Sequence, residues 1–277
     1  MKIKLICDSL CDVPKELVEK YDIEVIPLTV IIGDKEYKDG LDISNEEFYE
    51  MMKINKEVPK TSQATYIQFK EAFDKYVEEY EIVCITGSSK SSGTYQSAVM
   101  AKNDTNGEIH IFDTLTLSLG SAQYIVKACE LLNTNISSKE MIQNLEDIRE
   151  SVNLFFVVNT LEYLKRSGRV SVTTATIGNM LHLKPVFSVK DGNILLIDKI
   201  RGKKHVVHTM INLIKEKYDN LEDKNIIIGC GVNENDFCAL KKELEETLKA
   251  KSVYRAQGGV CICSHTGPNI LAISCSN

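Results

Sequence analysis

A turn rich in serine and glycine, Gly87-Ser88-Ser89-Lys90-Ser91-Ser92-Gly93-Thr94, is the segment of this sequence best suited to hold a ligand. Its eight positions contain four serines, two glycines and one threonine, which offer many hydroxyl and N–H donors and little bulk. We expect a helix to begin at about Thr94, where its free N–H groups and dipole favour an anion. The same composition is typical of a flexible turn before a capped helix, so the turn alone leaves both interpretations open.

The spacing of this turn excludes a nucleotide-binding loop. Gly87 and Gly93 are six residues apart and Thr94 follows where a phosphate-binding loop needs lysine, and G-x-G-x-x-G is also absent. Two further hydroxyl-rich segments, Thr61-Ser62-Gln63 and Ser264-His265-Thr266-Gly267-Pro268, could join the turn at the crevice of an open α/β sheet. By residue type alone, His265 fits a loop hydrogen-bond network better than catalysis.

Known catalytic and metal-binding patterns are missing from the sequence. There is no G-x-S-x-G, no H-E-x-x-H, and the nine cysteines form no zinc-ligand spacing. Asp8-Ser9 and Asp113-Thr114 follow predicted strands, so a pair of acids is conceivable, although helix capping or loop fixing is the more usual role. We therefore predict no catalytic residue and no metal.

The composition and the N-terminal segment predict a cytoplasmic protein with reduced thiols in its core. The chain has 277 residues, 33 Lys and Arg, 39 Asp and Glu, and a net charge of −6, which gives no general reason to bind nucleic acid or an anionic membrane. The first apolar run ends at Asp8, too early for a signal peptide or a membrane helix. An odd number of cysteines without paired spacing argues against a disulfide framework.

Short β-rich runs alternate with helical patterns in the first half, which predicts a mainly parallel sheet with flanking helices. The expected strands are 3–7, 24–32, 81–86 and 108–114, and the expected helices are 14–21 with Asp12 as N-cap, 44–52 with a Ser44/Glu47 capping box, 66–79, 94–103 and 117–132. The second half predicts strands at 154–158, 186–189, 193–198, 225–229 and 259–263 and helices at 204–218 and 234–250. The short Asp191-Gly192 turn implies an antiparallel hairpin, so we expect two domains, 1–150 and 151–277, the second with a mixed or antiparallel sheet.

Taken together, seven stretches make the whole chain resemble the DegV family, the fatty-acid-binding subunits of bacterial fatty acid kinase. They occur in the family's order and are Asp8-Ser9 with Asp12-Val13-Pro14, Pro59-Lys60-Thr61-Ser62-Gln63, 88–98, Asp113-Thr114, 161–171, Lys199-Ile200-Arg201-Gly202 and His265-Thr266-Gly267-Pro268.

The resemblance implies that a long-chain fatty acid is enclosed between two domains and that the chain itself is not an enzyme and needs no cofactor. It implies that the carboxylate is bound by Thr61, Ser62, Ser92, Gly93, Thr94 and His265. A separate kinase, similar to dihydroxyacetone kinases, would phosphorylate that carboxylate, and Arg169 and Arg201 would face the kinase. The bound tail would supply affinity, because each buried methylene contributes about 0.8 kcal/mol.

Two departures from the family pattern concern the site. Ala64 stands where proline usually follows T-S-Q, and Asn269 stands where a small residue is usual and could alter the wall of the site. The rival hypotheses are an enzyme acting on a small phosphorylated or carboxylated metabolite, which requires a polar crevice, and a purely regulatory interaction module. Acyl length and oligomeric state are left open.

Overall fold

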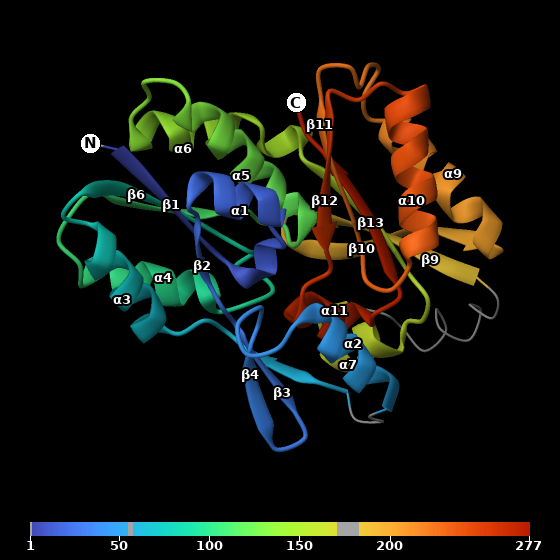
Figure 1. Ribbon diagram of the computed structural model, residues 1–277, viewed down its shortest axis with the longest axis horizontal. Coiled ribbons are helices and arrows are strands. Elements are labelled where there is room, and N and C mark those ends of the chain that lie inside the picture. The colour runs from blue at the N-terminus through green and yellow to red at the C-terminus, as the bar shows by residue number, and fades with distance from the viewer. Residues whose placement is uncertain (1, 55–57, 171–182) are drawn as a thin grey trace.

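The first sheet is parallel and has the strand order β2-β1-β6-β7. The computed structural model describes residues 2–54, 58–170 and 183–277 (Figure 1). The strands of this sheet are β1 (Lys2–Asp8), β2 (Glu24–Ile26), β6 (Tyr80–Thr86) and β7 (Ile109–Asp113). Alternate side chains along β1 and β6 are buried in two different apolar clusters, one on each face, as a parallel sheet covered by helices requires.

Helices cover both faces of the first sheet (Figure 1). One face carries α3 (Tyr66–Tyr76) and α4 (Thr94–Asn103), and the other carries α5 (Leu119–Leu132) and α6 (Ser138–Asp147), with α1 (Lys15–Tyr21) packed on α5. Capping boxes start α3 at Thr65 and α6 at Ser137, where each side chain accepts the N–H three residues on. Helix α5 also contacts the second sheet, so it is buried on two sides.

The second sheet has six strands in the order β10-β9-β8-β13-β11-β12. Its strands are β8 (Asn153–Val158), β9 (Leu183–Lys190), β10 (Asn193–Arg201), β11 (Asn225–Cys230), β12 (Ser252–Gln257) and β13 (Ile270–Cys275). Strands β11 and β12 pair in parallel and the other neighbours are antiparallel. Helices α9 (Val206–Lys215) and α10 (Glu234–Lys242) pack on one face, and α5 packs on the other.

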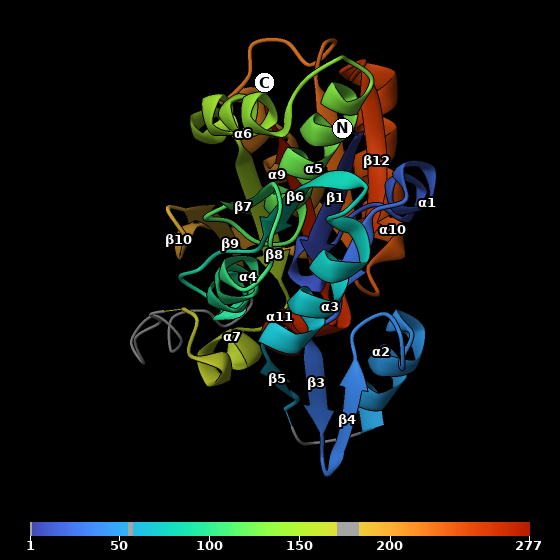
Figure 2. The same cartoon turned by 90° about the vertical axis from the view of Figure 1, so that its left-hand side faces the viewer.

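A smaller antiparallel sheet and two short helices complete the described structure. Figure 2 shows β3 (Thr29–Ile32) and β4 (Lys35–Lys38) projecting from the main sheets, with β5 (Lys60–Ser62) beside β3 and α2 (Asn45–Ile54) next to them. Helix α11 (Val260–Thr266) contacts β3, β5 and α7 (Glu162–Ser167). Short 3-10 or π turns lie at Ser9–Cys11, Arg149–Ser151, Lys203–His205 and Glu243–Thr247.

The α/β fold with one parallel and one mixed sheet is confirmed, as are the 189–193 hairpin, the Ser44/Glu47 capping box and a helix over 94–103. The predicted strand at 259–263 is wrong, because this apolar run forms α11. A short apolar run buried on all sides carries no period that separates a strand from a helix. Strands β12 and β13 and helix α6 were not predicted.

Two further local predictions are wrong. The expected strand 24–32 is interrupted at Pro27, which cannot donate to a sheet ladder, and its second half belongs to the small sheet. Asp12 does not cap α1, because the cap position is held by Pro14, which makes no side-chain bond. The Asp12 carboxylate instead accepts the N–H of Gly259, far away in the sequence. Ser171, the last residue of one family-like stretch, lies outside the described residues. Within the described ranges, no helix combines the length and apolarity needed to cross a bilayer.

Candidate functional site

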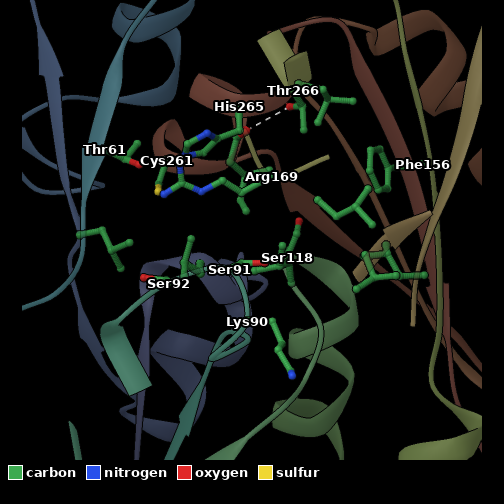
Figure 3. A pocket seen from close by; sticks show the side chains of 18 of the residues that line it. Thr61, Lys90, Ser91, Ser92, Ser118, Phe156, Arg169, Cys261, His265 and Thr266 are labelled. Carbon is green, nitrogen blue, oxygen red and sulfur yellow. Dashed lines mark hydrogen bonds between the residues drawn. The ribbon is translucent and has the colours of Figure 1, made fainter. Parts of the chain in front are cut away.

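A cavity of about 460 Å³ lies where the Ser/Gly turn, β5, α11 and the second sheet meet (Figure 3). Its volume is within the range of roughly 300–1,000 Å³ that is usual for sites of small organic ligands. Its polar lining comprises Thr61, Ser62, Gln63, Ser89, Lys90, Ser91, Ser92, Gly93, Ser118, Arg169, His265 and Thr266. Its less polar lining comprises Leu10, Leu28, Leu117, Leu154, Phe156, Leu164, Val189, Ile194, Cys261, Ile262, Ile270 and Ala272.

Several polar side chains of this cavity lie away from its apolar wall, although Ser118 and Thr266 lie nearer to that wall (Figure 3). Figure 3 shows Thr61, Ser92 and His265 gathered on one side, with Phe156 on the opposite side. The apolar wall is built by strands β8 and β13, which place Leu154, Phe156, Ile270 and Ala272 toward the cavity. The cavity therefore suits a ligand with one polar end and one apolar end.

The carboxylates of Asp8, which is buried, and Asp113, which is half-buried, hold the Ser/Gly turn in place. Asp8 accepts the N–H of Gly87 at 2.9 Å and of Leu10 at 2.8 Å, and Asp113 accepts the N–H of Ser89 at 3.1 Å. Burial is the main cause that raises the pKa of Asp8 to about 7, although the two N–H donors oppose the shift. These contacts are the roles of capping and loop fixing: Asp8 caps the short turn Ser9–Cys11, and both acids fix the Ser/Gly turn.

The N-terminus of α4 meets the cavity through Ser92 and Gly93, which both line it. Ser92 Oγ lies 2.8 Å from Thr94 Oγ1 and accepts the Thr94 N–H at 3.3 Å. Thr94 itself is fully buried behind Ser92, accepts the Ala64 N–H at 3.3 Å, and does not line the cavity. The structure thus brings Ser92 and Gly93 to the cavity and places Thr94 behind them.

The connector with Thr61 and Ser62 is attached to α4 by Gln63. Gln63 Nε2 donates to Ser97 Oγ at 3.0 Å, and its side-chain amide lies directly against Gly93. A Cβ atom at Gly93 would approach Gln63 Oε1 to 2.0 Å, so only glycine leaves room for this contact. Pairing of β5 with β3 then sets Thr61 and Ser62 at the cavity.

His265 reaches the same place from α11, although it is 204 residues from Thr61 in the chain. Its Nε2 atom lies 2.8 Å from Thr61 Oγ1, and its buried Nδ1 has no hydrogen-bond partner among the residues that the structure describes. Burial, and secondly the positive charge of Arg169, lowers the pKa of His265 to about 4. The imidazole is therefore neutral at pH 7, with one N–H donor and one acceptor.

Two acids that sequence reasoning did not place in the site hold α11. Asp39 accepts the N–H groups of Val260 and Cys261, each at 3.1 Å, and so caps the N-terminus of this helix. Asp12 accepts the Gly259 N–H at 3.0 Å and the Ser118 hydroxyl. Burial raises the pKa of both carboxyls. The sequence gives no local signal for these contacts of Asp12 and Asp39, because each hydrogen bond joins segments that are more than 100 residues apart.

The two arginines expected to act together lie in different places. Arg169 follows α7 and lines the cavity beside His265, with Nη1 donating to the Ser167 carbonyl at 2.7 Å. Arg201 ends β10, is exposed and does not line the cavity. Asn269 is also exposed and borders a separate depression, so it does not alter this cavity wall, whereas its neighbour Ile270 does line it.

The cysteines are free thiols, and all but Cys238 are buried, as their apolar context predicts. In the described part of the chain, no three His, Cys, Asp or Glu side chains are grouped as a metal ion would require.

Comparisons with known proteins agree with the two-sheet architecture. The family model described as "Uncharacterised protein, DegV family" matches residues 2–277. A DegV domain-containing protein of Caldanaerobacter subterraneus subsp. tengcongensis is 33% identical over 275 residues, covering 98% of each chain. A fatty-acid-binding DegV family protein from Thermus thermophilus has a TM-score of 0.93 at 29% identity and covers 100% of both chains. A stearic-acid-binding protein from Eubacterium ventriosum has a TM-score of 0.91 at 30% identity, covering 100% of this chain and 98% of its own. The present chain therefore belongs to the DegV family.

Proposed function

We propose that this protein binds a long-chain fatty acid in the cavity and does no chemistry on it alone. The observation that carries the proposal is the division of the cavity into one hydroxyl-rich side and one apolar side. Related proteins of the same fold have been described as fatty-acid-binding, one of them with stearic acid. In this proposal the ligand is enclosed between the two lobes formed by residues 1–150 and 151–277.

The apolar wall would supply most of the affinity. Each methylene transferred from water to an apolar surface contributes about 0.8 kcal/mol, so a long acyl chain gains of order ten kcal/mol before ordering costs. Leu154, Phe156, Ile270 and Ala272 offer such a surface. An enzyme for a small polar metabolite would have no use for this wall, which favours the carrier over that alternative.

The polar side would fix the orientation of the carboxylate. A buried carboxylate is costly unless several donors satisfy it. We assign this task to the hydroxyls of Thr61, Ser62 and Ser92, to the Gly93 backbone at the start of α4, and to His265, with Thr94 supporting Ser92. The neutral imidazole would act through hydrogen bonding rather than as a charge.

We further propose that a separate kinase, similar to dihydroxyacetone kinases, phosphorylates the bound carboxylate to an acyl phosphate. The resemblance of the sequence supports this step and assigns Arg169 and Arg201 to the surface that faces the kinase. Arg201 is exposed, as this role requires.

Extraction of the natively purified protein with organic solvent, followed by mass spectrometry, tests the binding proposal. We expect about one long-chain fatty acid per chain. Recovery of no such lipid, combined with failure of the stripped protein to take up added hexadecanoic acid, would contradict it.

Replacing Ser92 and His265 by alanine tests the head-group assignment. Because a hydrogen bond to a charged group contributes about 1.5–3 kcal/mol, each change should weaken fatty acid binding by about tenfold or more. His205→Ala, which removes an exposed histidine away from the cavity, is the control. Unchanged lipid retention and unchanged kinase-dependent acyl phosphate formation in both site variants would show that the assignment is wrong.

A further inference from the structure

A groove of about 700 Å³ lies between α2 and the second sheet, apart from the lipid cavity. Among the described residues, none lines both spaces. Figures 1 and 2 place α2 below the end of β12, and the Gln257 amide joins the two elements by donating to Glu46 Oε1 at 3.2 Å. One wall of the groove therefore comes from residues 37–51 and the other from residues 231–257, and the proposed function uses neither.

The floor of this groove is apolar. It is formed by side chains from β4, from α2 and the residues before it, and from the turn after β11, namely Tyr37, Ile43, Tyr49, Met51 and Val232. Val232 is exposed, and so are Leu41 and Ile54, which lie before and at the end of α2. Large apolar side chains that are gathered at one exposed groove mark a surface for a partner.

The rim of the groove carries only negative charge. Its acidic side chains are all exposed and are Asp42, Glu46, Glu47, Glu50 and Glu234. No Lys, Arg or His is among the described residues that line it. Cations outside the groove pair with two of these acids, Lys53 with Glu50 and Arg255 with Glu234, whereas the other three accept hydrogen bonds from uncharged donors. The rim therefore favours a cationic partner.

Helix α2 places negative charges on successive turns. Glu46 and Glu50 are four residues apart, so they lie on one face of the helix, where like charges at this spacing destabilise it. Carboxylates one turn apart match basic side chains one turn apart on a second helix that lies alongside, as at the flanks of a coiled coil. An apolar floor between charged flanks is the surface that receives the apolar face of an amphipathic helix.

We propose that this groove is a docking surface for a basic amphipathic helix of a partner protein. Lysine or arginine side chains of the partner pair with Glu46, Glu50 and the acids beside them, and an apolar side chain packs on the floor against Val232. The inference is independent of the proposed function, because the groove shares no described residue with the lipid cavity.

Binding of labelled model helices to the full chain, measured by fluorescence anisotropy, tests this inference. The probe is a helical peptide with leucine on one face and lysine on the other, and the comparison peptide has glutamate in place of lysine. One variant, Glu46→Gln with Glu50→Gln, removes two charges of the rim, and another, Val232→Ser, makes the floor polar. The matched control is Glu78→Gln with Glu79→Gln, which removes two charges at exposed positions outside the groove. Thermal melting checks that each variant is folded.

We expect the lysine peptide to bind at least about tenfold more tightly than the glutamate peptide. Glu46→Gln with Glu50→Gln should weaken this binding by about three- to thirtyfold, as loss of two exposed ion pairs does. Val232→Ser should weaken it by about three- to tenfold, because an apolar contact is lost. The control with Glu78 and Glu79 changed should stay within about twofold of the unmodified protein.

Several results would overturn the inference. Equal losses in the two double variants would mean that the peptide responds to net charge alone, and an unchanged affinity of Val232→Ser would mean that the floor is not used. Spermidine that displaces the peptide at an equal concentration would assign the groove to a small cation. A dimer in sedimentation that Glu46→Gln with Glu50→Gln separates would assign it to a second copy of this chain. Binding of hexadecanoic acid is measured separately, so each of these results leaves the proposed function intact.

Discussion

His265 illustrates how the site can be polar without being charged. Its ring lies against Thr61 and is mostly removed from water, next to a permanent positive charge on Arg169. Both features disfavour the imidazolium form, which is why the pKa is lowered. A neutral ring keeps one donor and one acceptor, so it can relay a hydrogen bond between Thr61 and a carboxylate.

The first prediction concerns the titration of this residue. The His265 ring should titrate near pH 4 in the folded protein, against about 6.5 in an unfolded chain, and Arg169→Gln should raise the midpoint. Because the folded state binds fewer protons in this window, the contribution of His265 to stability is present above pH 6.5 and is lost as pH falls through 4. NMR titration of the histidine ring protons measures the midpoint, and the His265→Ala variant identifies which signal belongs to His265. A midpoint at 6 or above would show that the ring is not buried as described.

At the scale of elements, the packing of β5 on α4 depends on one glycine. The φ angle of Gly93 is −73°, so its backbone conformation suits any residue. Glycine is required here because a side chain would overlap with a neighbouring group. The connector and the helix are held together by Gln63, whose amide occupies the position of the missing Cβ.

The second prediction follows from this contact. Gly93→Ala should displace the Gln63 amide, which is the end of a flexible and exposed side chain, and break its bond to Ser97, so the free energy of unfolding should fall by about 0.5–1.5 kcal/mol, the usual contribution of one hydrogen bond. Fatty acid affinity should fall as well, since Thr61 and Ser62 precede Gln63. Denaturant unfolding and lipid titration are the measurements. In a Gln63→Ala background there is no amide to displace and no bond to break, so Gly93→Ala should cost little further stability; a further loss as large as in the single variant would contradict the steric explanation.

Helix α11 has only seven residues and owes its place to acids from distant segments. Asp39 accepts two of its first N–H groups and Asp12 accepts the N–H just before it. A short helix is marginal without tertiary support, so these bonds help to hold both the 259–266 segment and His265, together with the burial of Val260 to Cys263 in the core.

The third prediction tests that support. Asp39→Asn keeps the shape of the side chain but replaces one acceptor oxygen by a donor, so one helix N–H loses its partner. We expect a loss of about 1–3 kcal/mol in unfolding free energy and weaker fatty acid binding. Asp42→Asn is the control, since Asp42 is exposed and accepts the nearby N–H of Lys38. Equal effects of the two variants would show that capping of α11 by Asp39 is unimportant.

At the scale of the whole molecule, the cavity joins parts of the structure that are far apart in sequence. Its walls come from the Ser/Gly turn beside the first sheet, from β8 and β13 of the second sheet, and from α11 between them. A ligand in this place contacts all three, so its binding energy adds to the stability of the folded chain as a whole.

The fourth prediction is that bound lipid raises the melting temperature according to chain length. At a free concentration a hundred times Kd, hexadecanoic acid should stabilise the chain by about 2.7 kcal/mol. Octanoic acid at the same concentration should stabilise it less, because it buries fewer methylenes. Calorimetry of delipidated and reloaded protein gives both values. Equal shifts with the two acids would mean that the apolar wall does not hold the tail.

Local sequence determined the features whose causes are local. The Ser/Gly turn, the helix that starts at Thr94, the capping box at Ser44 and the hairpin at Asp191-Gly192 follow from turn and cap chemistry within a few residues. The order of the family-like stretches was enough to indicate the family, and with it the group of Thr61, Ser92 and His265.

Tertiary structure decided what depends on contacts between distant segments. The 259–263 run lies in a helix whose first N–H groups are bonded to Asp39 and Asp12, and no pattern within that run separates a short buried helix from a strand. Thr94 turns out to lie behind Ser92, while Arg169 faces the cavity and Arg201 does not. Residue type and spacing give the donors and the charges, but only the packing of the two sheets and α11 decides which of them share one cavity.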